Sequence, residues 1–316
     1  MTEKEWIKYL KKFLYEKDPV FAAHNEDCSV VKISKNKYFL YTTDALVEGI
    51  HFDLRFTDFY SLGYKLAASN LSDIAAMGGT PKWALLTMGS PKPPEKDWID
   101  PFMKALTKLL KKYKARLIGG DTVKSPFYFF NLALTGETNL PLLRSGAKEG
   151  DLVFVSKRLG GSAAFLRYIK NTPLEKIPAH LKKSYLQPEP EIALGKKLRK
   201  IAHAVIDISD GLLLDLYRIC EASRVSAELE EEKIPLSKGA LLHEALSGGE
   251  DYALLFTISE EKKEKLFQIS KKLKKTLFYI GKITRGKHKI FLKTKEGVRK
   301  ELTPSGYDHF TFQPQL

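Results

Sequence analysis

The chain has 316 residues, enough for one large domain or two of ordinary size, and its hydrophobic fraction of 43% is enough for globular cores. Its formal charge of +14 suits anionic partners, but no recognisable nucleic-acid-binding motif accompanies that charge. The cysteines Cys28 and Cys220 lie in no CxxC motif, which argues against a zinc knuckle. No apolar run approaches about 18 residues, which argues against a membrane span, and the charged N-terminus argues against a signal peptide. The sequence therefore predicts a cytoplasmic protein.

The first half of the chain alternates predicted helices and strands. Apolar residues at helical spacing occupy residues 5–15, and two short strands are predicted near 30–33 and 38–42. The elements that follow are a helix over 61–77, a strand over 82–88, a helix over 97–114, a strand over 115–121 that ends in a glycine turn, and an aromatic strand over 126–138. This order is typical of an α/β or α+β domain.

A domain boundary is predicted where "TNLPLLR", residues 138–144, breaks the alternation, which gives domains over 1–138 and 139–316. The elements predicted after it are a strand over 151–156, a glycine turn and helix over 158–169, a helical stretch over 186–201, a strand over 203–209, a helix over 211–223, a strand over 252–257, a lysine-rich helix, and strands over 277–283 and 289–292. The lysine clusters fall near the C-terminal ends of predicted helices, where the helix dipole favours positive charge, so they indicate solvent-exposed helix faces.

Most of the notable acidic residues lie beside Gly, Ser or Thr where a predicted element ends. In "FLYTTDALVEGIHF", an apolar strand is predicted to stop at Thr42, Thr43 and Asp44. The other members of the set are Asp27, Asp73, Asp121, Asp207, Asp210, Glu250 and Asp251. A single such residue is typical of a helix cap or a turn. The whole set instead indicates ligands for a hard divalent cation such as Mg²⁺, which binds carboxylates together with phosphate oxygens.

Glycines near these acids indicate phosphate binding. Gly119, Gly120, Gly248 and Gly249 would let backbone amides approach a phosphate closely. The familiar nucleotide motifs are absent from the sequence: there is no P-loop, no GxGxxG and no kinase HRD/DFG pair, and "LSGGED" resembles a transporter signature without the P-loop that it requires. A basic chain with an acidic, glycine-lined centre points to polyanionic substrates bound with metal.

Six segments, taken together and in order, carry a resemblance to a known family. They are "TTDALVEGIHF", "NLSDIAAMGGTPKWAL", "LIGGDTVKSP", "LTGET…RSGAKEGDLVFVS", "DISDGLLLDL" and "GGEDYALLF". They strongly resemble the thiamine-monophosphate kinase family of the aminoimidazole ribonucleotide synthetase-like superfamily. The resemblance implies an α/β fold with an α+β N-terminal domain that forms a homodimer through its mixed sheet, and an α/β C-terminal domain. It also implies phosphorylation of thiamine monophosphate to thiamine diphosphate, with ATP as co-substrate and several Mg²⁺ ions.

The resemblance implies roles for individual residues. Those on magnesium-binding positions are Asp27, Thr42, Asp44, Asp73, Asp121, Asp207 and Asp210, with Thr43 in the same strand segment. Those on ATP-binding positions are Gly120, Asp121, Arg144 and Ser209, and those on thiamine-phosphate-binding positions are His51, Glu250 and Tyr307. Tyr307 offers a stacking surface for a cationic aromatic ring. No general base is expected, because the acceptor phosphate is already ionised.

Some positions depart from the family pattern, and other functions stay open. Asn25-Glu26 stands where the family usually has Gly-Asp, Gly161 where Asp is common, Glu191 where Arg is common, and Met103 where some members have Tyr. The alternatives are another ATP-using member of the superfamily, a member that has lost its activity, and a basic nucleic-acid-binding protein whose acids are structural. "LVEGIHF" and Tyr307 favour the kinase, whereas a steep salt dependence of RNA or DNA binding would favour the last alternative.

Overall fold

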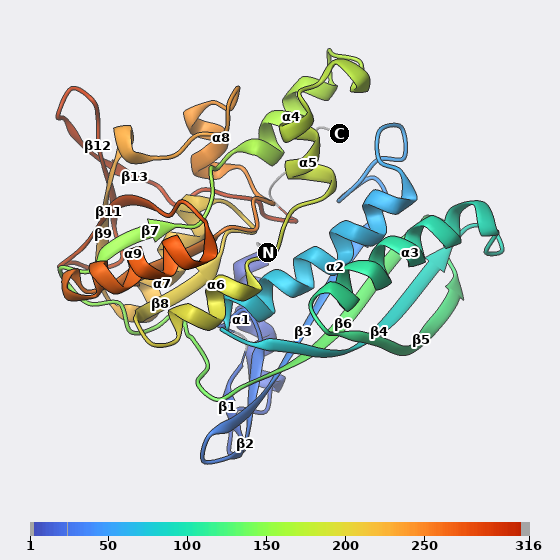
Figure 1. The fold of residues 1–316 in the computed structure, drawn as a ribbon, viewed down its shortest axis with the longest axis horizontal. Coiled ribbons are helices and arrows are strands. Elements are labelled where there is room, and N and C mark those ends of the chain that lie inside the picture. Colours follow the sequence, from blue (N-terminus) through green and yellow to red (C-terminus); the bar gives the residue numbers. More distant parts are fainter. Residues whose placement is uncertain (1–2, 24, 311–316) are drawn as a thin grey trace.

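The structure is a computed structural model that describes residues 3–23 and 25–310. Two β-sheets dominate it, each covered by helices (Figure 1). The first sheet has six strands in the order β1-β2-β3-β6-β4-β5. Their bounds are β1 Val20–Ala22, β2 Ser29–Ser34, β3 Lys37–Val47, β4 Thr80–Ser90, β5 Arg116–Lys124 and β6 Phe129–Thr138. All neighbours pair antiparallel except β4 and β5, so the sheet is mixed.

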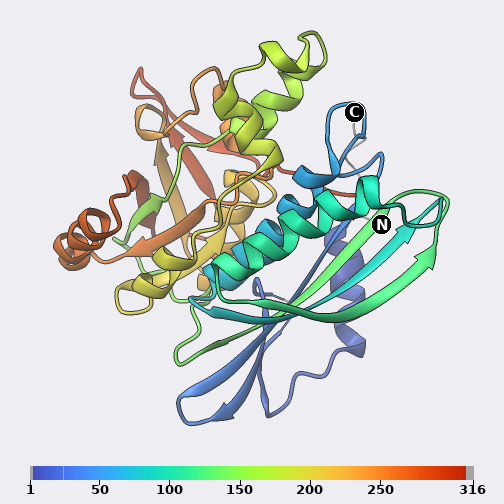
Figure 2. The ribbon, with the colours of Figure 1, turned by 45° about the vertical axis from the view of Figure 1, so that its right-hand side comes forward.

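Two long helices, α2 (Phe59–Ala76) and α3 (Lys96–Lys112), lie side by side over one face of this sheet (Figure 2). A short helix, α1 (Glu3–Leu10), and a 3₁₀ turn, η1 (Lys11–Phe13), precede the sheet. Asp58 caps α2 by accepting the Ser61 backbone N–H at 2.8 Å. Because α2 packs on the first sheet, on α3 and on elements of the second domain, it is buried on nearly all sides. It therefore brings its polar residues to the boundary between the two sheets.

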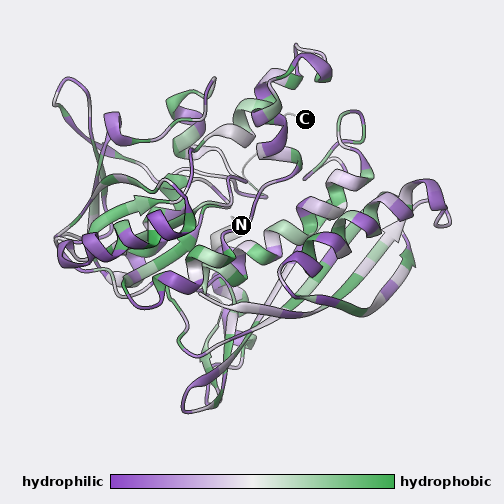
Figure 3. Cartoon of the chain, in the orientation of Figure 1, coloured by the Kyte–Doolittle hydropathy of each residue, from purple (hydrophilic) through white to green (hydrophobic). Residues whose placement is uncertain are grey.

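The second sheet has seven strands in the order β13-β12-β9-β11-β7-β10-β8. Their bounds are β7 Leu152–Val155, β8 Ala202–Asp207, β9 Ser226–Glu230, β10 Leu254–Ile258, β11 Phe278–Thr284, β12 Ile290–Lys293 and β13 Arg299–Leu302. The helices around it are α4 Gly161–Ile169, α5 Ala179–Leu186, α6 Ile192–Leu198, α7 Leu212–Ser223, α8 Leu242–Ser247 and α9 Lys263–Leu273, with 3₁₀ turns η2 Leu174–Lys176, η3 Glu231–Lys233 and η4 Glu260–Lys262. Figure 3 shows apolar residues along the strands and a mostly hydrophilic α9.

Two predicted strand ends are wrong. The main-chain pairing of β3 with β6 runs without interruption from Tyr38 to Val47, so Thr42, Thr43 and Asp44 lie inside a strand and not at its end. In the same way, β5 continues through Gly119, Gly120 and Asp121 to Lys124, where the sequence predicts a turn. The physical reason is that backbone pairing with a neighbouring strand outweighs the preference of polar residues and glycine for turns.

The sequence also missed several elements: β1, β9, β13 and the short helices α5 and α8. The two sheets are joined by residues 139–151, between the end of β6 and the start of β7. The α/β fold class is confirmed, whereas the boundary predicted after residue 138 stays a prediction. Of the helices that the structure describes, none is long and apolar enough to cross a membrane. Both cysteines are buried as free thiols.

Candidate active site

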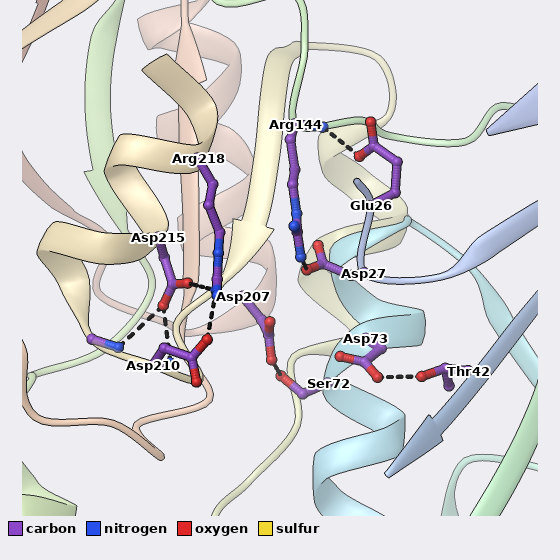
Figure 4. A network of polar contacts seen from close by, with 11 residues as sticks. Glu26, Asp27, Thr42, Ser72, Asp73, Arg144, Asp207, Asp210, Asp215 and Arg218 are labelled. Atoms are coloured by element: carbon purple, nitrogen blue, oxygen red, sulfur yellow. Dashed lines mark hydrogen bonds and ion pairs between the residues drawn. The ribbon is translucent and has the colours of Figure 1, made fainter. Parts of the chain in front are cut away.

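Three acidic residues that are far apart in the sequence meet between the two sheets (Figure 4). Asp27 lies in the loop before β2, Asp73 near the end of α2, and Asp207 at the end of β8. One carboxylate oxygen of each lies within 4.8 Å of the other two. Like charges at this separation repel strongly away from bulk water, so a bound cation would stabilise the arrangement.

The pKa shifts of these residues have the same physical cause. Burial, with the nearby Asp44 and Asp207, holds the pKa of Asp73 well above its ordinary value. Burial, with the nearby Asp27, does the same to the pKa of Asp207. Asp44 lies close by on β3, and burial together with Asp210 and Asp27 raises its pKa to about 6. Four carboxylates therefore share one poorly solvated region.

The residues fit a hard divalent cation. Oδ2 of Asp27 is buried and has no hydrogen-bond partner among the described residues, as expected of an oxygen reserved for a metal. The other oxygens are held in place: the Ser72 hydroxyl donates to Oδ2 of Asp207 at 2.6 Å, and the Thr42 hydroxyl donates to Asp73. An all-oxygen donor set of this kind is what Mg²⁺ prefers.

The alternation of β3 separates the two predicted threonine ligands. Thr42 and Asp44 point to the face covered by α2, whereas Thr43 points to the opposite face. There the Thr43 hydroxyl accepts a hydrogen bond from Nδ2 of Asn131 at 2.9 Å. The Thr43 side chain is therefore not brought to the carboxylate cluster.

Asp121 and Gly120 also lie far from the carboxylate cluster of their own chain. They lie on β5, which β6 and β4 separate from β3, a distance of about 14 Å at ordinary strand spacing. Asp121 is exposed, and its Oδ1 accepts the Thr122 backbone N–H at 2.8 Å. Gly120 has a packing role of its own, because a Cβ there would lie 1.8 Å from the Leu86 carbonyl oxygen. Their predicted roles with metal and ATP stay predictions.

A second polar network holds the turn after β8. Arg218 forms ion pairs of 2.6 Å with both Asp210 and Asp215. The Asp215 carboxylate also accepts the backbone N–H groups of residues 210 and 211, both at 3.2 Å. Sequence reasoning missed Asp215 and Arg218; the signal was an acidic residue in the first turn of the helix that follows "DISDG". This network fixes the orientation of the Asp210 and Ser209 segment.

Arg144 joins the cluster from the segment between the sheets. Its guanidinium donates to Oδ1 of Asp27 at 2.5 Å, and its backbone N–H donates to Glu26 at 2.7 Å. Burial raises the pKa of Glu26 to about 7. Nε of Arg144 is buried and has no hydrogen-bond partner among the described residues.

A cavity of about 890 Å³ opens beside the cluster. Asp44, Asp73, Ser209 and Asp210 are among the residues that line it. The predicted acceptor residues His51, Glu250 and Tyr307 line it as well, together with His309. The structure thus brings three predicted metal-binding residues, Asp44, Asp73 and Asp210, into one space with the predicted acceptor residues, and Asp73 belongs to both the cluster and the cavity wall.

Three rings form a row along the acceptor part of the cavity. The ring centres of His51 and His309 are 5.1 Å apart, and those of His309 and Tyr307 are 4.8 Å apart. Burial, and then the charges of His309 and Lys65, lower the pKa of His51 to about 4, so its imidazole is neutral at pH 7. Since Nδ1 of His51 accepts the Val47 backbone N–H at 3.1 Å, its proton is assigned to Nε2.

The loop "GGEDY" closes the cavity with an unusual backbone. Glu250 and Tyr252 have φ angles of +64° and +47°, a region that residues other than glycine adopt rarely. Between them, Oδ2 of Asp251 accepts the Gly160 backbone N–H at 2.7 Å at the start of α4. Strained backbone of this kind concentrates at functional sites, where the surrounding structure maintains it.

Three departures from the family pattern lie outside the cluster. Gly161 packs closely, since a Cβ there would lie 2.5 Å from the Ser184 hydroxyl. Glu191 is buried in an ion pair of 2.7 Å with Lys275, and Met103 packs against the apolar core. Each residue has a structural role where it stands.

Comparisons with known proteins identify the family of the chain. Residues 25–138 match the family model "AIR synthase related protein, N-terminal domain", and residues 148–293 match "AIR synthase related protein, C-terminal domain". A thiamine-monophosphate kinase of Haemophilus influenzae is 39% identical, with 98% of each chain covered, and one of Escherichia coli K12 is 37% identical, with 90% of each covered. A solved structure described as "AaThiL complexed with AMPPCP and TMP" is similar with a TM-score of 0.84 at 33% identity, covering 98% of this chain and 97% of that one.

The two family matches and the convergent carboxylates define the general class as that of the AIR synthase related proteins. Within that class, the sequence identity to curated thiamine-monophosphate kinases extends over 90–98% of the chain and decides the family. The chain belongs to the thiamine-monophosphate kinase family.

Proposed function

We propose that the protein transfers the terminal phosphoryl group of ATP to thiamine monophosphate, which gives ADP and thiamine diphosphate. The observation that carries the proposal is the position of Asp73, which belongs both to the carboxylate cluster and to the cavity lined by His51, Glu250 and Tyr307. The relatives that share most of the chain are named for this reaction, and the similar solved structure is described as a complex with AMPPCP and TMP.

The carboxylates would hold the metal. Asp27, Asp73 and Asp207 would bind Mg²⁺, with Asp44 and Asp210 beside them. Bound Mg²⁺ supplies positive charge that offsets the repulsion between two phosphate groups meeting in line. Arg144 adds a fixed positive charge next to the cluster through its contact with Asp27. No residue needs to remove a proton, because the acceptor oxygen is already ionised.

The acceptor would lie along the row of rings. Tyr307 lines the cavity, and its ring would stack on the cationic thiazolium or on the pyrimidine of thiamine monophosphate. The Nε2–H of neutral His51 is a hydrogen-bond donor suited to the acceptor phosphate. Glu250 presents a carboxylate to the same cavity, which favours a cationic ligand. This arrangement supports the acceptor roles that the sequence predicts for all three residues.

We also propose that the protein is a cytoplasmic homodimer formed through the uncovered face of the first sheet, with residues 1–138 and 139–316 as its two domains. The face opposite α2 carries large apolar side chains that are about half exposed: Tyr41 43%, Trp83 52%, Leu85 50% and Val123 45%. A row of this kind on a sheet is typical of an interface. Analytical ultracentrifugation of the wild type and of Trp83→Lys tests it: a dimer that the substitution weakens is expected, and a monomeric wild type would contradict it.

One assay tests the reaction itself. The protein is incubated with ATP and either thiamine monophosphate or unphosphorylated thiamine, with and without Mg²⁺, and the products are separated by chromatography. Thiamine diphosphate should form from the monophosphate only when Mg²⁺ is present. Thiamine should be a poor acceptor, because its hydroxyl would need a base that the site does not provide. Equal turnover of both acceptors would exclude this mechanism.

A further inference from the structure

A fully buried lysine lies beside the cavity and contacts three of its lining residues. Lys65 lies in the first half of α2, and its side chain is 0% exposed. Its Nζ is 2.6 Å from Oε1 of Glu250, 3.4 Å from the His51 carbonyl oxygen and 3.8 Å from the ring centre of Tyr185. A fully buried lysine needs a charged partner and hydrogen-bond acceptors of this kind, because burying an unpaired ammonium group is strongly unfavourable.

These contacts use all the donors of the ammonium group. An ammonium has three N–H bonds, and around Lys65 there are three acceptors: a carboxylate, a backbone carbonyl and an aromatic face. Lys65 therefore has no N–H left for a phosphate or for a reacting atom. It acts on the site through the groups that it holds.

The groups that Lys65 holds come from three separate segments. The His51 carbonyl belongs to the turn after β3, Tyr185 to α5, and Glu250 to the loop before β10. The Tyr185 hydroxyl donates to the same His51 carbonyl at 3.1 Å, which closes the network. His51, Tyr185 and Glu250 all line the cavity, so one side chain sets the relative positions of three of its walls.

Glu250 has the greatest need of such support. Its φ of +64° is one that non-glycine residues adopt only where their surroundings enforce it. Oε1 is taken by Lys65, while Oε2 accepts a hydrogen bond of 3.4 Å from the Ser162 hydroxyl at the start of α4. The ion pair thus helps to fix the orientation of the Glu250 carboxylate.

We propose that Lys65 is a positioning residue that fixes Glu250 and the His51 turn for recognition of the acceptor. This inference rests on the proposed function, since it assumes that the acceptor is thiamine monophosphate. It predicts a change confined to that substrate. ATP binding is assigned to the carboxylate cluster, Arg144 and Ser209, and none of these contacts the Lys65 side chain in the described structure.

The test compares Lys65→Met, Glu250→Gln and the double variant with the wild type. Steady-state kinetics give KM for each substrate, and calorimetry gives the Kd of thiamine monophosphate in the presence of Mg²⁺ and a non-hydrolysable ATP analogue. Lys65→Met should raise the KM and Kd of thiamine monophosphate roughly ten- to a hundredfold, the usual effect of a displaced contact, and should change the KM of ATP by less than about twofold. The Kd of thiamine monophosphate for the double variant should be no higher than that of the single variant with the higher Kd, because both substitutions break the same ion pair.

The matched control is Lys289→Met, which removes an exposed lysine paired with Glu301 at 2.8 Å and should leave both KM values unchanged. An unchanged Kd for thiamine monophosphate in Lys65→Met, or equal losses for both substrates, overturns the positioning role. If Lys65→Met does not fold, Tyr185→Phe is the second variant, because it removes the hydroxyl that donates to the same His51 carbonyl and leaves Glu250 in place. It should raise the Kd of thiamine monophosphate and leave the KM of ATP unchanged, and an unchanged Kd overturns the positioning role. If the wild type binds thiamine monophosphate without phosphorylating it, the proposed function is overturned but the positioning role of Lys65 is not. The Kd values of the wild type and of Lys65→Met still test that role.

Discussion

The Ser72 hydroxyl donates a hydrogen bond of 2.6 Å to Oδ2 of Asp207, and both side chains are buried. Ser72 lies on α2, which packs on the first sheet, whereas Asp207 ends β8 of the second sheet. The next residue, Asp73, contributes to the carboxylate cluster. The cluster is therefore assembled where the two sheets meet, and α2 links them.

Ser72→Ala should weaken the binding of Mg²⁺ without removing a ligand. Loss of a hydrogen bond that orients a metal-binding carboxylate typically lowers metal affinity about ten- to a hundredfold. Titration of activity with Mg²⁺ should show a higher half-saturating concentration and nearly full activity at saturation. A loss of activity that excess Mg²⁺ does not restore would instead indicate a damaged fold.

Asp44→Asn and Asp73→Asn should reduce turnover strongly while the protein stays folded. The loss of a metal-held phosphate contact costs several kcal/mol in the transition state, or roughly a thousandfold in rate. Each change also removes one of several repelling carboxylates, so the Tm of the metal-free protein should not fall. The rise in Tm on adding Mg²⁺ should shrink, whereas Asp100→Asn on the exposed side of α3 should behave as the wild type. A collapsed Tm in the metal-free variants would show that these residues brace the core.

Asp121→Asn tests whether the site is completed by a second copy. Asp121 lies on the face of the first sheet that is proposed to form the dimer, so any action on bound metal or ATP must cross that interface. We expect Asp121→Asn and Asp44→Asn to be nearly inactive alone and to recover up to about a quarter of wild-type activity when mixed and exchanged, as expected for random pairing of dimers. Activity of Asp121→Asn near that of the wild type would remove it from the site.

Tyr307 and His51 should act on the acceptor and not on ATP. A stacking contact with a desolvated cation contributes about 1–2 kcal/mol, so Tyr307→Ala should raise the KM of thiamine monophosphate roughly five- to thirtyfold. Tyr307→Phe should be nearly silent, because the ring face makes the contact. His51→Ala should also raise this KM by removing its Nε2–H donor. Weaker ATP binding with unchanged acceptor binding would assign these residues to the other substrate.

Asp251 should make stability depend on pH. Burial raises its pKa from 3.8 to about 7, so the folded protein binds a proton that the unfolded chain has already released at intermediate pH. This contribution to stability is complete below pH 3.8 and is lost as pH rises through about 7. Asp251→Asn keeps an acceptor for the Gly160 N–H and does not titrate. The Tm of Asp251→Asn minus that of the wild type should therefore increase from about pH 5 to pH 8; a constant difference would contradict the shift.

Sequence periodicity located most of the long helices and the buried strands, because these depend on local apolar spacing. The helix predicted over 61–77 and the strand predicted over 126–138 correspond to α2 and β6 within a few residues. The strand ends predicted at Asp44 and Asp121 were wrong, since pairing with strands distant in the sequence extends β3 and β5 through polar residues and glycine. The short strand β13 has no apolar pattern of its own and forms by pairing with β12.

The sequence by itself determined the family, the residue types and the kind of chemistry. The order of the acidic and glycine-rich motifs and the ligand chemistry of their side chains can be read without knowing where these residues lie in space. Only the tertiary structure decided which acids meet: Asp27, Asp73 and Asp207 converge, while Asp121 lies on an outer strand and Thr43 on the opposite face of β3. It also showed the contacts of Lys65 with Glu250 and of Ser72 with Asp207. These contacts join segments far apart in the chain, and no local pattern encodes them.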